Sequence, residues 1–205
     1  MNMKDNSSLL YMVLVLSLLT LVSAAGLSYI NELVKEPIAR SEKLERTRAL
    51  KAVLPAFDND PLEDKQEIDL QGRTVVVYPG RKQGKLVGLA FDLSTKQGYG
   101  GEIVLLAGFL PDGTVNGYYV LASSETPGLG DRMKEDGFKQ QFHGWDLLKN
   151  PDFKVVKDGG KIQALTAATI TSRAVCDAFN QAHAVFGAYM KQHPPATAEN
   201  NQEVQ

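Results

Sequence analysis

The chain begins with a long apolar segment. Residues 9–30 contain no charged residue, and 22 residues in a helix are enough to cross a hydrocarbon core of about 30 Å. Apolar residues continue past the small residues Val22, Ser23 and Ala24. We therefore predict a transmembrane anchor over residues 9–30. The alternative is a cleaved signal peptide whose apolar region ends near Val22.

The segment that follows the anchor is charged and predicts a helical stalk over residues 31–55. Its last turn becomes apolar over residues 49–54, and Pro55 then ends the helix. This apolar end is expected to dock on the following domain. The acidic stretch 58–64 has no EF-hand spacing, so we interpret it as a solvated loop.

Short strand and turn patterns predict two antiparallel hairpins. The first spans residues 74–92 with its turn at Pro79-Gly80, and the second spans residues 103–121 with its turn at residues 111–113, Pro-Asp-Gly. Residues 103–107 are apolar at every position, which is typical of a strand covered on both faces.

A C-terminal helix is the predicted cover for this sheet. Residues 170–191 place apolar side chains on one helical face, namely Val175, Ala178, Phe179, Ala182, Phe186 and Tyr189. The predicted class is α+β, with a domain over residues 56–193. Residues 194–205 have no apolar periodicity and are predicted to be a disordered tail.

Composition restricts the chemistry. The chain has 22 basic and 24 acidic residues and no basic run, which argues against nucleic-acid binding. Cys176 is the only cysteine, so the chain cannot form an intrachain disulfide, a CxxC pair or a cysteine-ligated cluster. His143, His183 and His193 match no ligand spacing, and we predict no metal site. Any redox function would need a bound cofactor.

The charges that flank the anchor do not decide its orientation. Lys4 is the only basic residue before the apolar segment, whereas residues 32–51 contain six basic and four acidic residues. A literal positive-inside count puts the following domain in the cytoplasm, but long domains translocate regardless of charge. The topology therefore stays open on this criterion.

Three segments could carry chemistry. Residues 165–172, LTAATITS, place four hydroxyl side chains at the start of the predicted helix, where they could cap it or help to bind a phosphate. Residues 124–131, SETPGLGD, follow a strand, and their glycines could let the backbone approach a flat ligand or could simply form a loop. Residues 97–101, QGYGG, could be a turn or a further ligand contact.

In this order, GYGGEI, ETPGLG and TAATITS resemble the FMN-binding domain of RnfG, a subunit of the Rnf ion-translocating electron-transport complex. The chain is also similar, more distantly, to NqrC of the sodium-pumping NADH:quinone oxidoreductase. The resemblance covers nearly the whole chain. It implies an electron-carrier subunit with covalent FMN in a membrane complex that couples electron transfer to ion translocation. The implied partners are the other subunits of that complex and a flavin transferase.

The resemblance also implies a location and an attachment residue. The domain would lie outside the cytoplasm, anchored in the cytoplasmic (inner) membrane, with residues 1–8 in the cytoplasm. The family motif reads Asp-x-x-Ser/Thr-Gly-Ala-Thr, and its last threonine carries FMN through a phosphoester. That residue is Thr169 here, and Thr166 and Ala168 also match.

Two positions depart from the motif, because Gln163 replaces Asp and Ala167 replaces Gly. These departures put the efficiency of attachment in question. Alanine at 167 is tolerated if its φ is negative and strained if its φ is positive. By the same resemblance, further residues would contact the flavin or lie close to it: Glu125, Thr126, Gly128, Leu129, Gly130, Tyr99, Gly100 and Gly101.

Two other functions are open. An assembly or scaffold subunit that has lost its flavin is suggested by Gln163 and Ala167. A self-contained flavin oxidoreductase with a soluble substrate would need acid and base residues in a pocket, and the sequence offers no evident set. The same lack of a general acid, nucleophile or metal triad argues against a stand-alone hydrolase.

Overall fold

The computed structural model describes residues 3–70 and 73–193. The chain divides into two compact units, Met1–Glu45 and Arg46–Gln205, and each is described by itself. The predicted disordered tail, 194–205, lies outside the described residues.

The first unit consists of most of helix α1, which runs from Met3 to Val53. From Leu10 onward it is long and apolar enough to cross a membrane, and its apolar side chains up to Ile30 are exposed. A signal sequence meets the same test of length and composition. The helix ends before Pro55, as the sequence predicts.

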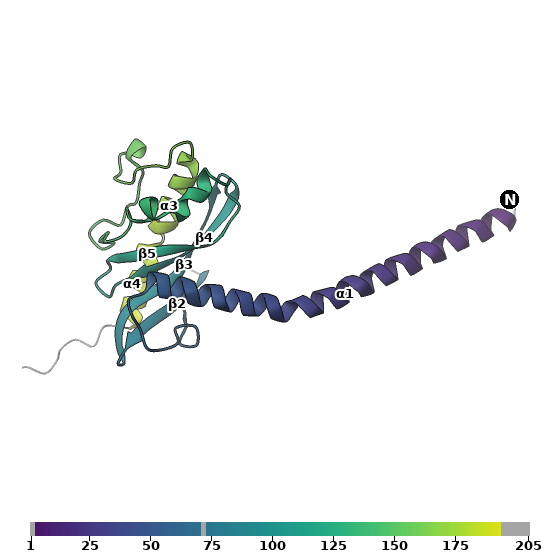
Figure 1. Ribbon diagram of the computed structural model, residues 1–205, viewed down its shortest axis with the longest axis horizontal. Coiled ribbons are helices and arrows are strands. Elements are labelled where there is room, and N and C mark those ends of the chain that lie inside the picture. The colour runs from purple at the N-terminus through teal and green to yellow at the C-terminus, as the bar shows by residue number, and fades with distance from the viewer. Residues whose placement is uncertain (1–2, 71–72, 194–205) are drawn as a thin grey trace, which may run out of the picture. The chain divides into compact units, whose positions relative to one another are not determined.

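The second unit is built on a five-stranded antiparallel sheet in the order β1-β2-β3-β4-β5 (Figure 1). The strands are β1 Gln66–Leu70, β2 Arg73–Lys82, β3 Lys85–Gly98, β4 Gly101–Phe109 and β5 Val115–Ser123. The other elements are η1 Gly130–Lys134, α2 Asp136–Lys139, η2 Val156–Asp158, α3 Thr169–Asn180 and α4 Ala182–Gln192. The α+β class is confirmed, as is the turn between β4 and β5 at residues 111–113.

The predicted turn at Pro79-Gly80 is wrong. Strand β2 continues through these residues, and the chain reverses at Gln83 and Gly84, whose φ values of 51° and 76° are those that a two-residue hairpin turn needs. Gly80 pairs with Gly88 across the strands, and a Cβ at Gly80 would lie 3.2 Å from Leu54 Cδ1. Gly80 therefore provides space for the end of α1 rather than a turn.

Both faces of strand β4 are covered, as predicted. On one face, Phe109 stacks on Phe91 of β3 with ring centroids 4.7 Å apart, and both belong to the core shared with α3 and α4. On the other face, Leu106 packs with the end of α1, including Leu50 and Val53. The apolar end of the predicted stalk therefore docks on the sheet.

The predicted single helix over 170–191 is two helices, α3 and α4, which break at Gln181. Side chains at the break bind other segments: the Asn180 amide accepts from Phe153 N–H and donates to Phe153 O, and Gln181 Nε2 donates to Ser94 O at 2.8 Å. The predicted apolar face is confirmed, since all six of its residues are buried.

Cys176 is buried in the core. Trp145 is partly buried and stacks on Phe153 with centroids 4.8 Å apart. His143, His183 and His193 are exposed. Within residues 3–70 and 73–193, no cluster of His, Cys, Asp or Glu has the arrangement of a metal site.

Candidate functional site

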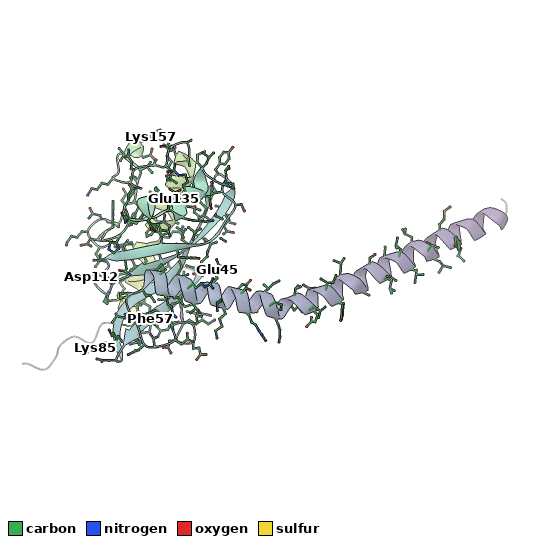
Figure 2. The ribbon with its side chains drawn as sticks, viewed as in Figure 1. Glu45, Phe57, Lys85, Asp112, Glu135 and Lys157 are labelled. Carbon is green, nitrogen blue, oxygen red and sulfur yellow. The ribbon has the colours of Figure 1, made fainter. Side chains whose placement is uncertain are left out.

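The three segments selected from the sequence meet at one end of the sheet. Gly98 pairs with Gly101 across the turn that joins β3 to β4. At the same end Ser123, the last residue of β5, pairs with Ile103 near the start of β4. Figure 2 shows Lys157, which belongs to this end, far from Lys85, the first residue of β3, at the opposite end of the domain.

A buried carboxylate connects these segments. Glu125 is 7 % exposed, and its Oε1 accepts a hydrogen bond from Gly100 N–H at 3.1 Å. Its Oε2 accepts from the Thr171 hydroxyl of α3 at 2.7 Å. One side chain therefore joins the β3–β4 turn, the loop after β5 and the first turn of α3.

Two glycines make room for this arrangement. A Cβ at Gly100 would collide with the carbonyl oxygen of Ser124, and a Cβ at Gly130 would collide with Glu125 and lie 2.6 Å from Thr171 Oγ1. Both positions therefore need glycine for packing within the protein. Gly128 differs, because it has open space around it and a φ of 76°.

The segment before α3 is held in a tight turn by Ser172. The Ser172 hydroxyl donates to Ala168 O at 3.0 Å and accepts from Leu165 N–H at 2.9 Å. Within this turn Ala167 has a φ of 63°, in the left-handed region. The strained alternative for Ala167 is therefore the one that the structure adopts.

The hydroxyl groups of this segment fall into two classes. No side chain caps α3, so the capping interpretation is wrong. Thr171 and Ser172 are buried and donate to protein acceptors, whereas the hydroxyls of Thr166 and Thr169 have no hydrogen-bond partner among the described residues. Thr169 is the first residue of α3 and is partly exposed.

A pocket of about 570 Å³ lies between these segments. Its lining residues are Tyr99, Glu125, Thr126, Leu129, Gly130, Ala167, Ala168, Thr169, Ile170 and Thr171. This volume is typical of sites for small molecules. Tyr99, Leu129 and Ile170 are 71 %, 42 % and 49 % exposed, so large apolar side chains gather around the pocket and face solvent. Such a group of exposed apolar residues is typical of a binding surface.

A second cavity of about 290 Å³ adjoins the first, and Thr169 lines both. Thr166 and Lys157 also line this second cavity. Arg173 of α3 holds η2 beside it, donating from Nε and Nη2 to the Asp158 carboxylate at 2.7 Å each. These hydrogen bonds place the pKa of Asp158 below its usual range. The positive charge of Arg173 is therefore already paired.

The structure brings most of the predicted site residues together. Seven of the eleven residues named from the sequence line the larger pocket: Tyr99, Glu125, Thr126, Leu129, Gly130, Ala168 and Thr169. Gly101, the first residue of β4, does not line it. Thr166 lines the smaller cavity instead, while Gly100 contacts Glu125 and Gly128 forms part of the loop, so neither lines the pocket. Sequence reasoning missed Ala167, Ile170 and Thr171 as pocket residues, although all three lie within two positions of Thr169.

Comparison with known proteins gives matches over the same region and over the whole chain. A family model described as an FMN-binding domain matches residues 98–184. The chain is 36 % identical to the RnfG protein of the ion-translocating oxidoreductase complex of Stutzerimonas stutzeri, covering 94 % of this chain and 85 % of that protein. It is 33 % identical to the protein of the same name from Vibrio cholerae, covering 88 % of this chain and 89 % of the relative.

Solved structures share the fold. NqrC of Shewanella oneidensis superposes with a TM-score of 0.50 at 22 % identity, covering 69 % of this chain and 71 % of the other. The corresponding component of a Na⁺-translocating NADH-quinone reductase from Parabacteroides distasonis gives a TM-score of 0.50 at 20 % identity, with 69 % and 70 % coverage.

Proposed function

This chain belongs to the RnfG family of ion-translocating oxidoreductase subunits, and from this premise we propose that it is a membrane-anchored electron carrier with FMN attached covalently to Thr169. The FMN-binding domain that matches residues 98–184 contains all three segments of the pocket. The main support for this proposal is that these segments, which are distant in sequence, line one pocket. The Thr169 hydroxyl at its edge has no hydrogen-bond partner among the described residues.

The residues present fit an FMN. Tyr99, Leu129 and Ile170 offer apolar surface for a flat ring system, and they face solvent, where a second protein could approach. Thr169 offers a hydroxyl for a phosphoester. The first N–H groups of α3 have no partner within the helix, and together with its dipole they favour a phosphate at this position.

Each side chain then has a distinct role. Thr169 holds the group, the apolar side chains orient it, and Glu125 and Ser172 fix the surrounding backbone. FMN supplies the electron chemistry, while the protein supplies attachment, orientation and electrostatic environment. A covalent bond suits a domain outside the cytoplasm, where a lost cofactor is not easily replaced.

The proposed partners follow from the family. RnfG relatives are named as subunits of a complex, so we infer that this chain exchanges electrons with neighbouring subunits and receives its flavin from a flavin transferase. We further propose that α1 anchors the chain in the cytoplasmic membrane and that the domain lies on the extracytoplasmic side. In this proposal residues 9–30 span the membrane, residues 31–55 form the stalk and residues 56–193 form the FMN-binding domain.

One observation favours a second function. Ala167 occupies a left-handed position where the family motif has glycine, and Gln163 replaces the motif's aspartate. A chain that has lost its flavin and serves only in assembly would have no selection against such changes. A measurement of covalently attached flavin separates the two functions.

The test is a pair of substitutions at one position. The full chain is co-expressed with a flavin transferase, and flavin is detected by fluorescence of the denatured gel band and by the mass of the peptide that contains residue 169. Thr169→Ala is expected to abolish attachment and Thr169→Ser to retain it, because only serine keeps a hydroxyl. Since the Thr169 hydroxyl has no partner among the described residues, the alanine variant should lose no more than about 0.5 kcal/mol of stability.

Two results would contradict the proposal in different ways. Fluorescence that persists in Thr169→Ala would place the flavin on another residue. A wild-type chain without flavin, despite a transferase that modifies a control substrate, would favour the assembly function.

A further inference from the structure

Glu125 is unusual among the acidic residues of the domain because it is buried and lines the larger pocket. Both of its oxygens accept hydrogen bonds, from Gly100 and Thr171. No Lys, Arg or His within residues 3–70 and 73–193 forms an ion pair with it. Its carboxylate is therefore bound by two neutral donors, and its charge is not balanced by a cation.

We propose that Glu125 has two separable functions toward the flavin of this pocket: its hydrogen bonds position the pocket, and its negative charge lowers the reduction potential of the flavin. This inference rests on the proposed function, because it assumes that the ring lies in the pocket that Glu125 lines.

The positioning function follows from the contacts. Gly100 and Thr171 lie 25 and 46 residues from Glu125 in sequence, and each is bonded to a different carboxylate oxygen. The side chain thus fixes the distance between the β3–β4 turn and the start of α3. Tyr99 and Ile170, which neighbour these partners, are two of the three large exposed apolar residues of the pocket.

The electrostatic function follows from burial. In a one-electron step, one electron leaves the donor and enters the flavin, with no bond formed or broken and no proton moved. The pocket then gains one negative charge, which a nearby carboxylate repels, and repulsion is stronger in a buried site than in water. The hydrogen bond from Thr171 draws some of this charge away from the carboxylate and so moderates the effect.

Substitutions can separate the two functions. In Glu125→Gln, the amide oxygen can accept from Gly100 N–H and the amide nitrogen can donate to the Thr171 oxygen, so both contacts are kept while the charge is removed. The matched control is Glu67→Gln, which removes the same charge from an exposed position on edge strand β1. Four strand spacings separate β1 from β5, about 19 Å.

A second pair keeps the carboxylate charge and alters the hydrogen bond that moderates it. Thr171→Val keeps the side-chain shape and the carboxylate but removes the hydroxyl that donates to Glu125. Thr171→Ser keeps that hydroxyl and is the conservative rescue.

The measurement is the reduction potential of the covalently loaded flavin, obtained by spectroelectrochemical titration of the full chain in detergent. We expect a more positive potential in Glu125→Gln, no shift in Glu67→Gln, a more negative potential in Thr171→Val and the wild-type value in Thr171→Ser. A Glu125→Gln potential equal to that of Glu67→Gln would overturn the electrostatic function.

Should Glu125→Gln fail to fold or to retain flavin, the Thr171 pair decides the question. A Thr171→Val potential equal to that of Thr171→Ser would then refute the inference. A wild-type chain that carries no flavin would refute the proposed function and this inference together, whereas loaded variants with identical potentials refute only the inference.

Discussion

Replacing Ala167 by glycine tests whether the turn before α3 stores strain. Ala167 has a φ of 63°, a conformation that costs a non-glycine residue about 1–2 kcal/mol. Ala167 is exposed, so the loss of its methyl group removes little packing. Glycine relieves the strain but loses more backbone entropy on folding, about 0.5–1 kcal/mol. The expected net result for Ala167→Gly is a gain in stability of about 0.5–1 kcal/mol.

The assay is thermal unfolding of the full chain in detergent. For a chain of this size, 1 kcal/mol corresponds to roughly 2–4 °C in Tm, so the variant should unfold about 1–4 °C higher than the wild type. We also expect more complete flavin attachment with a limiting amount of transferase, because glycine adopts the required turn without strain and restores the family motif at this position.

A reverse substitution provides the control. Gly84 has a φ of 76° in the β2–β3 turn, and an added Cβ would have no atom within 4 Å, so Gly84→Ala should cost stability through backbone conformation alone. If Gly84→Ala lowers Tm and Ala167→Gly leaves it unchanged or lowers it, Ala167 is not strained and our account of the departure from the motif is wrong.

Two further predictions concern the core and the topology. Burial raises the pKa of the Cys176 thiol to about 12, so at pH 8 only roughly one thiol in 10⁴ is ionised. Iodoacetamide should therefore label Cys176 in denaturant but not in the folded protein. Rapid labelling of the folded protein would show that this part of the core opens. Reporter fusions after Gln205 should be active with a reporter that works only outside the cytoplasm, and activity solely with a cytoplasmic reporter would overturn the proposed location.

Sequence patterns correctly predicted the elements that are determined by residues close together in the chain. The turn at residues 111–113 joins β4 to β5, and the helical periodicity of the last apolar stretch identified a face that is fully buried. Pro79-Gly80 has the same local signature as a turn but lies within β2, because Gly80 and Gly88 together accommodate Leu54. That requirement comes from Leu54, directly after α1, which is distant in sequence and which a rule for local turns does not consider.

The break between α3 and α4 has a similar origin. Periodicity over residues 170–191 is continuous, and no glycine or proline marks Gln181. The side chains of Asn180 and Gln181 are instead bound to Phe153 and to Ser94 of β3. Only the tertiary structure supplies these partners.

The site was located by family resemblance rather than by chemistry read from residues alone. The segment LTAATITS contains four residues with hydroxyl groups, and its local pattern does not indicate which of them has a function. The structure distinguishes them, since Thr171 and Ser172 are buried and engaged with Glu125 and Ala168. Local spacing could not predict this, because Glu125 lies 46 residues from Thr171.

The position of the pocket follows from the topology of the sheet. In an antiparallel meander, β3 and β5 run in the same direction, so the turn after β3 and the loop after β5 lie at the same end. Helix α3 starts at this end and runs back along β3. Asp177 accepts a hydrogen bond from Thr95, and Gln181, directly after α3, donates to Ser94, which lies further from the pocket end of the strand.

The fold thus brings a turn, a loop and a helix start together at one end of the sheet. The proposed function depends on a few additions to this framework: a free hydroxyl at Thr169, apolar side chains that stay exposed, and a buried carboxylate without a cation. Exposed apolar side chains and an unbalanced buried charge each reduce the stability of a folded domain unless something binds there. Their occurrence together at one end of the sheet is therefore better explained by a binding site than by folding alone.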